Sequence, residues 1–181
     1  ITGSDANGTY EILTYVNKTA ASIRTKALTE VTETITPDGS GNLNFTKADI
    51  NSIVRITLAD SDGTDLTTSY DLDNGQRDFA YLNGRMIKKA GAATPSSDVF
   101  VRYKHFDHGA SGDFFAVNSY TGQVDYEDIP SYTQSNGTEV SLRNVLDFRS
   151  RKGDKDSDFS VATGVIHELP SNTDLITADV E

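Results

Sequence analysis

Three acidic residues near the C-terminal end are spaced as in a calcium-binding loop. Asp154, Asp156 and Asp158 fit positions 1, 3 and 5 of that template. The template has glycine at position 6 and glutamate at position 12, where this chain has Phe159 and Val165. The run is therefore more typical of a solvated charged loop, and at most a weak calcium site is expected there.

The histidines and serines form no recognisable catalytic or metal-binding pattern. His105 and His108 lie three residues apart and His167 is far along the chain, whereas zinc sites usually need three suitable protein ligands. The chain has no cysteine, no G-x-S-x-G motif and no glycine-rich phosphate loop. We therefore expect no catalytic residue, no metal ligand and no cofactor-binding residue, and we predict that the protein is not an enzyme.

Paired carboxylates leave one catalytic alternative open. Asp125, Glu127 and Asp128 lie close together in the sequence, and glycoside hydrolysis uses two carboxyl groups that flank the scissile bond. Such groups are also common on acidic surfaces. A glycan-degrading domain is for this reason the less favoured alternative.

Charge is unevenly distributed along this acidic chain. The net charge is −11, which argues against nucleic-acid binding because such binding depends on neutralising phosphates. Between His105 and Leu142 there are six acidic residues and no lysine or arginine, and basic residues return from Arg143 onward. This segregation indicates either complementary faces that pair between subunits or simply a solvated loop surface.

The sequence predicts that short β-strands position these candidate residues. Strand-like runs of alternating, β-branched or aromatic residues occur at 10–16, 25–36, 53–59, 98–106, 113–120 and 123–129. Asn-Gly and Asp-Gly pairs fall among them, as expected for hairpin turns. No apolar run approaches the roughly 18 residues that a membrane span requires. The sequence predicts an all-β fold of antiparallel, sandwich-like modules with hairpins and at most one or two short helices.

Three local predictions are more specific. Asn83-Gly84 lies between two strand-like runs and predicts a type I′ hairpin turn. Residues 46–53 could form one or two helical turns with Thr46 as the N-cap. The apolar side chains of residues 141–148 have helical spacing, so a short helix is expected there, with an irregular segment as the open alternative.

The chain divides into three regions at this level. Residues 1–65 are either an N-terminal β module or the first strands of a single sandwich; 66–150 form the central module, and 151–181 are a C-terminal extension or linker. The chain begins with Ile1 and its only methionine is Met86, so we expect a processed product or a piece of a longer polypeptide.

Several segments of the central stretch resemble a module of tailed-bacteriophage virion proteins of the baseplate or tail-fibre type, a domain of unknown function. They are collinear and together fall within 70–149: YDLDNGQRD (70–78), the predicted hairpin 81–87, the predicted strand 99–106, SGDFFAVNSY (111–120), YEDIP (126–130) and LRNVLDFR (142–149). In that family proline often follows the Asp-Phe-Arg motif, whereas this chain has Ser150. The difference bears on where the module ends.

The resemblance implies a structural component of a phage tail that is built from many copies. It implies a trimer, or assembly on another virion subunit, and it carries no catalytic residue. The favoured hypothesis is a non-enzymatic structural and assembly domain located in the virion, whose partners are other virion subunits and further copies of the chain. A receptor- or carbohydrate-binding module that contacts a host surface glycan is the alternative.

Five charged residues are predicted to form structural polar contacts within this module. Arg77, Asp78 and Arg85 surround the predicted hairpin, and Asp147 and Arg149 lie near the end of the module. Buried pairs of this kind can fix the register and orientation of neighbouring elements, because breaking one leaves an unpaired charge.

Overall fold

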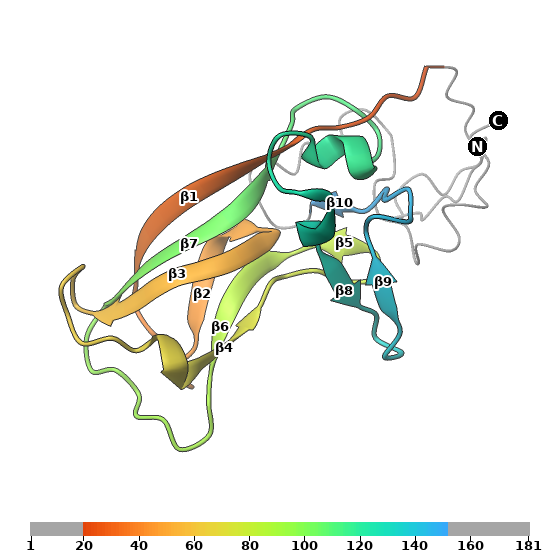
Figure 1. Ribbon diagram of the computed structural model, residues 1–181. Helices are drawn as coiled ribbons and strands as arrows, with labels where there is room; N and C mark the ends of the chain where they lie inside the picture. Colours follow the sequence, from red (N-terminus) through yellow and green to blue (C-terminus); the bar gives the residue numbers. More distant parts are fainter. Residues whose placement is uncertain (1–19, 152–181) are drawn as a thin grey trace, which may run out of the picture.

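The computed structural model describes residues 20–151, and two three-stranded antiparallel sheets form the larger part of them (Figure 1). The first sheet has the order β1-β7-β3, with bounds Lys26–Ile35 for β1, Val99–His108 for β7 and Ile50–Leu58 for β3. The second has the order β2-β6-β4, with bounds Leu43–Ala48 for β2, Asn83–Lys88 for β6 and Tyr70–Asp73 for β4.

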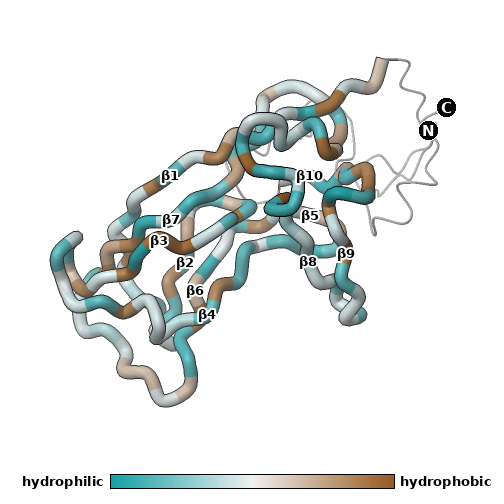
Figure 2. Tube along the Cα trace, viewed as in Figure 1, coloured by the Kyte–Doolittle hydropathy of each residue, from teal (hydrophilic) through white to brown (hydrophobic). Residues whose placement is uncertain are grey.

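The main hydrophobic core lies between these two sheets. Side chains alternate along β7, so Val99, Val101 and Tyr103 are fully buried on its inner side. The ring of Tyr103 stacks on that of Phe45 from β2, with 4.4 Å between the ring centroids. Hydrophobic residues, brown in Figure 2, recur along the strands of both sheets. The predicted all-β, sandwich-like architecture is thus confirmed.

A single residue, Asp49, connects β2 to β3 although the two strands belong to different sheets. Its φ of 54° lies in the left-handed region, which aspartate tolerates better than most residues. The helical turns predicted for 46–53 are therefore wrong. The apolar spacing that suggested them comes from the ends of two strands on either side of a sharp corner.

The type I′ hairpin predicted at Asn83-Gly84 is also wrong, because both residues lie inside β6. This strand pairs with β2 on one side and β4 on the other. Glycine is required here by packing, since a Cβ atom at position 84 would lie 2.3 Å from Cγ1 of Ile50. An Asn-Gly pair does connect a hairpin at Gly137, whose φ is 86°.

The second half of the chain adds smaller elements at one end of the sheets (Figure 1). At that end lie the hairpin of β8 (Ser131–Thr133) and β9 (Glu139–Ser141), the short strand β10 (Ser150–Arg151), which pairs in parallel with β5 (Ala80–Tyr81), and the 3₁₀-helices η2 (Val117–Tyr120) and η3 (Tyr126–Asp128). A further 3₁₀-helix, η1 (Thr67–Ser69), directly precedes β4. No α-helix occurs in the part of the chain that the structure describes. None of its helices is long and apolar enough to cross a membrane.

These elements build a second hydrophobic cluster against the end of β7. Phe106 is fully buried in it, and its ring contacts Tyr120 edge to face with centroids 5.2 Å apart. Three predicted elements are replaced here: 113–120 contains two isolated bridges and η2 rather than a strand, 123–129 contains η3 rather than a strand, and 141–148 contains turns rather than a helix. The segment 10–16 lies outside the described residues.

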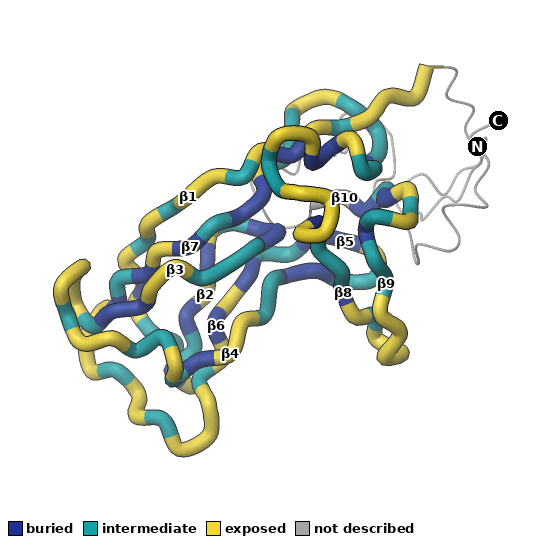
Figure 3. Tube along the Cα trace, viewed as in Figure 1, coloured by how far each residue is buried: buried dark blue, intermediate teal, exposed yellow. Residues whose placement is uncertain are grey.

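Strands from both sides of residue 65 share both large sheets. β1 and β3 pair with β7, and β2 pairs with β6, so residues 26–58 and 70–108 form one sandwich. Exposed residues, yellow in Figure 3, concentrate in the loops at the far end of this sandwich, including 89–98.

Replacing Gly75 with alanine is expected to destabilise the fold more than the same change at Gly91. Both glycines have a φ of +83°, so both substitutions carry the left-handed strain of about 1–2 kcal/mol. A Cβ atom at Gly75 would also lie 2.0 Å from the backbone oxygen of Leu82, whereas nothing lies within 4 Å at Gly91. The extra overlap should cost about 1–3 kcal/mol more, measured by urea unfolding of the two variants. Equal losses would contradict the close packing of this turn.

Candidate functional site: a buried polar cluster

Seven polar side chains meet at the end of the sandwich where the second half of the chain packs on it. We call them the polar cluster: Lys26, Asp49, Gln76, Tyr81, His108, Asp147 and Arg149. They come from the first residue of β1, the corner before β3, the loop after β4, β5, the last residue of β7 and the segment before β10. The side chains of the five charged or ionisable partners in its ion pairs are 0–3% exposed.

Asp49 is the acceptor at one side of the polar cluster. Its Oδ2 lies 2.7 Å from Nζ of Lys26 and 2.8 Å from Nε2 of His108. Its Oδ1 accepts a hydrogen bond of 3.1 Å from Nε2 of Gln76. The left-handed corner thus aims this carboxylate into the protein, where three donors surround it.

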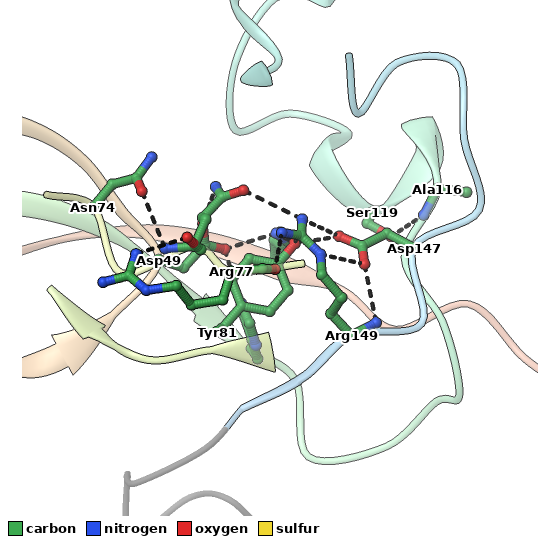
Figure 4. Close-up of polar contacts among 11 residues, drawn as sticks. Asp49, Asn74, Arg77, Tyr81, Ala116, Ser119, Asp147 and Arg149 are labelled. Atoms are coloured by element: carbon green, nitrogen blue, oxygen red, sulfur yellow. Dashed lines mark hydrogen bonds and ion pairs between the residues drawn. The ribbon is translucent and has the colours of Figure 1, made fainter. Parts of the chain in front are cut away.

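Arg149 is the donor at the other side (Figure 4). Its Nε and Nη2 bind the two carboxylate oxygens of Asp147 at 2.9 and 2.8 Å. Nη2 also donates to Oε1 of Gln76 at 3.2 Å, and Nη1 donates to the backbone oxygen of Arg77 at 3.0 Å. A guanidinium has five N–H groups in a fixed plane, so it can hold several segments at once.

Tyr81 joins the two sides. Its hydroxyl accepts hydrogen bonds of 3.0 Å from both Lys26 and Arg149, and it donates to Asp147. Gln76 provides the second connection, because it donates to Asp49 and accepts from Arg149. The Lys26–Asp49 and Arg149–Asp147 ion pairs therefore belong to one hydrogen-bonded network.

Aromatic rings surround both cations. Nζ of Lys26 lies 4.5 Å from the ring centroids of Tyr81 and Phe115, 5.0 Å from that of Tyr120 and 5.6 Å from that of Phe106. Cζ of Arg149 lies 3.8 Å from the ring of Tyr132 and 4.4 Å from that of Tyr81. Cation–π attraction is strongest where water is excluded, as it is here.

The environment displaces the pKa values of these groups away from neutrality. Burial by itself raises the pKa of Asp49, but the Lys26 ammonium and the His108 hydrogen bond outweigh it and lower the pKa overall. Burial likewise opposes the ionisation of Asp147, and Arg149 reverses the effect, so that its pKa is also lowered. The pKa of Lys26 is raised because Asp49 outweighs burial, and burial raises the pKa of Tyr81 well above its usual value.

Stability should therefore be highest on a plateau between about pH 5 and pH 9. Asp49 and Asp147 have lowered folded-state pKa values, so their contribution is complete above the unfolded pKa of about 3.9 and is lost as the pH falls through the folded values. Lys26 has a raised folded-state pKa, so its contribution is complete below about 10.4 and is lost as the pH rises through the folded value. Melting temperatures measured by circular dichroism between pH 2 and pH 11 test both limits. A melting temperature that rises as the pH is lowered below 4 would contradict the stabilising role of the ionised Asp49 and Asp147.

The chemistry of the polar cluster is that of ion pairing. A general base works best with a pKa near the operating pH, and a nucleophilic lysine needs a lowered pKa. Here Lys26 is held protonated, Tyr81 is held neutral, and Asp49 and Asp147 are held ionised. In these protonation states each group pairs with another group inside the protein. Their pKa values lie too far from neutrality for efficient proton transfer at neutral pH.

Of the residues predicted from the sequence, only Asp147 and Arg149 belong to the polar cluster. Arg77 and Arg85 instead converge on one carboxylate, that of Asp73, at 2.8 and 3.1 Å. These contacts are closer to solvent, because the two arginine side chains are 34% and 47% exposed.

Asp78, the remaining predicted residue, lies apart from both groups. Its carboxylate accepts hydrogen bonds from the backbone and hydroxyl of Ser135 in the β8–β9 connection. It therefore ties the loop after β4 to that hairpin. Asp125, Glu127 and Asp128 lie at η3 and are exposed.

Five members of the polar cluster were not predicted, namely Lys26, Asp49, Gln76, Tyr81 and His108. Asp49 offered a signal, because aspartate adopts left-handed backbone at sharp corners more readily than most residues. The others look in the sequence like ordinary strand or loop residues.

The calcium site considered at Asp154, Asp156 and Asp158 lies outside the described residues. Within residues 20–151 no group of three or more histidine, cysteine, aspartate or glutamate side chains is placed to hold a metal ion. Comparisons with protein-family models, with curated proteins and with solved structures give no match.

Proposed function

We propose that this chain is a non-enzymatic structural and assembly domain of a phage tail, baseplate or tail-fibre protein, located in the virion. The observation that carries the proposal is the position of the segments that resemble phage virion proteins. They converge on the polar cluster, which holds together parts of the chain that are far apart in sequence.

Three of these segments contribute most of the residues that converge there. The segment 70–78 supplies Gln76, and the segment 142–149 supplies both Asp147 and Arg149. The segment 111–120 supplies two of the rings around Lys26. Four of the seven members of the polar cluster thus lie in resembling segments, whereas Lys26, Asp49 and His108 lie outside them. This partial overlap is expected if the resemblance reflects a shared scaffold.

The state of the ionisable groups supports a structural role over a catalytic one. The charges are paired with one another inside the protein, and their pKa values are displaced from the range useful for proton transfer. An interior held together by ion pairs and hydrogen bonds can stabilise a particle component that has no cysteine and therefore no disulfide.

Light scattering of the purified chain across a concentration range tests the assembly role. We expect a trimer or a larger assembly of the 19.6 kDa chain. A chain that stays monomeric at all concentrations would contradict self-assembly. Release of reducing sugar ends from host polysaccharide would contradict the non-enzymatic assignment.

Carbohydrate binding is the second candidate function, and a surface depression favours it. The depression, about 380 Å³ in volume, is open and mainly polar, and lies between the segment around Asp73, Asn74 and Arg77 and the strand β8. Its amide, carboxylate and guanidinium groups could bind sugar hydroxyls. Binding on a glycan array that is lost in an Asn74→Ala variant would support this function, and no binding would contradict it.

A further inference from the structure

The outer face of the β1-β7-β3 sheet carries three basic side chains and one acidic side chain, Glu30, which lies opposite Lys104. Arg55 on β3 lies opposite Arg102 on β7 in the antiparallel register. Lys104 lies two residues further along β7 and therefore on the same face. We call Arg55, Arg102 and Lys104 the basic face.

The two arginines of the basic face are incompletely neutralised. Like charges that lie opposite one another across two strands repel. Arg55 has Asp65 at 3.7 Å and Arg102 has Glu30 at 3.4 Å, but all four side chains are 45–57% exposed, and ion pairs of this kind contribute little. Additional carboxylates docking on this face would relieve the repulsion.

An apolar side chain adjoins the basic face. Val54 is the extra residue at a shift in the β3–β7 register, and it is 36% exposed beside Arg55. The face thus combines two guanidinium groups, one ammonium group and an apolar contact, which suits an acidic partner with an aromatic side chain.

The same chain carries such a surface at η3. Asp125, Tyr126, Glu127 and Asp128 are four consecutive exposed residues, and Tyr126 is 52% exposed. Among the described residues, none of the three carboxylates forms an ion pair with a basic side chain. We call residues 125–128 the acidic turn.

We infer that the acidic turn of one copy of this chain docks on the basic face of another copy. Arginine binds carboxylates with two parallel hydrogen bonds, so the turn can engage Arg55 and Arg102 through charge-assisted contacts. Cζ of Arg143 of the same chain lies 5.4 Å from the ring centroid of Tyr126, and the part of the ring that stays exposed would pack on Val54. The inference rests on the proposed assembly role and assigns the residues that carry it.

Charge reversal on each surface tests the inference. One variant carries Arg55→Glu and Arg102→Glu, and the other carries Glu127→Lys and Asp128→Lys. The controls are Lys89→Glu and Asp71→Lys, single reversals of exposed charges associated with the other sheet. Circular dichroism melts establish that every variant is folded, and light scattering and sedimentation equilibrium measure association.

We expect each reversed variant to associate at least about tenfold more weakly than wild type, while the controls associate as wild type does. Mixing the two reversed variants should restore association between unlike variants, because the reversed turn of one then meets the reversed face of the other and the unchanged surfaces also match. Raising the salt concentration should weaken wild-type association.

The outcomes separate this inference from the proposed function. If the wild type assembles and the reversed variants assemble equally well, the docking surfaces are wrong and the assembly role stands. If the mixture stays dissociated although both variants are folded, the pairing of these two surfaces is overturned. A wild-type chain that remains monomeric overturns both proposals.

Discussion

Replacing Arg149 with leucine should lower the free energy of unfolding by about 3–5 kcal/mol, because it leaves a buried carboxylate without its cation. The side chains of Arg149 and Asp147 are 0% and 3% exposed, so water cannot replace the lost contacts. The substitution also removes the hydrogen bonds that Arg149 makes to Gln76, to Tyr81 and to the backbone of Arg77. Urea unfolding followed by circular dichroism measures the loss.

Arg85→Leu is the matched control for this prediction. Arg85 also binds an aspartate, but its side chain is 47% exposed and Arg77 binds the same carboxylate. Its removal should cost no more than about 1 kcal/mol. Arg149→Lys should fall between the two, since one ammonium group cannot reproduce the planar set of donors. A loss at Arg149 no greater than at Arg85 would show that the polar cluster does not stabilise the fold.

The elements that could be predicted from the sequence are those whose signal is local. Alternation in 98–106 identified β7, since Val99, Val101 and Tyr103 share the face that packs in the main core. β-branched residues identified β1 within 25–36. Asn83-Gly84 misled because an Asn-Gly pair marks a turn only where the strand ends, and here tight packing against Ile50 requires the glycine within a strand.

The polar cluster could be predicted only in part because its contacts are not local. Asp147 and Arg149 are two residues apart, so their pairing was accessible to sequence reasoning. Lys26 and Tyr81 are 55 residues apart, and they belong to strands of different sheets, β1 and β5. A strand-initial lysine is ordinarily solvent-exposed. Its burial here depends on four aromatic rings that come from other parts of the chain.

Replacing Lys26 with methionine should produce a loss of stability that depends on pH. Methionine fits the length of the site and its aromatic lining, so the main change is the removal of the cation beside Asp49. At pH 8 we expect a loss of about 3–5 kcal/mol, because the carboxylate of Asp49 retains only neutral donors. Urea unfolding at pH 8 and at pH 5 measures the loss relative to wild type under each condition.

At pH 5 the loss should be at least about 1 kcal/mol smaller, because His108 can supply the missing charge. Its Nε2 already lies 2.8 Å from Oδ2 of Asp49, and the rings of Tyr81 and Phe115 pack against it. An unperturbed imidazole changes its charge at about pH 6.5, so the imidazolium that can pair with Asp49 is available at pH 5 and is lost as the pH rises to 8. Adding Asp49→Asn removes the carboxylate and should abolish this pH dependence. A loss of equal size at both pH values would show that His108 does not pair with Asp49 in the absence of Lys26.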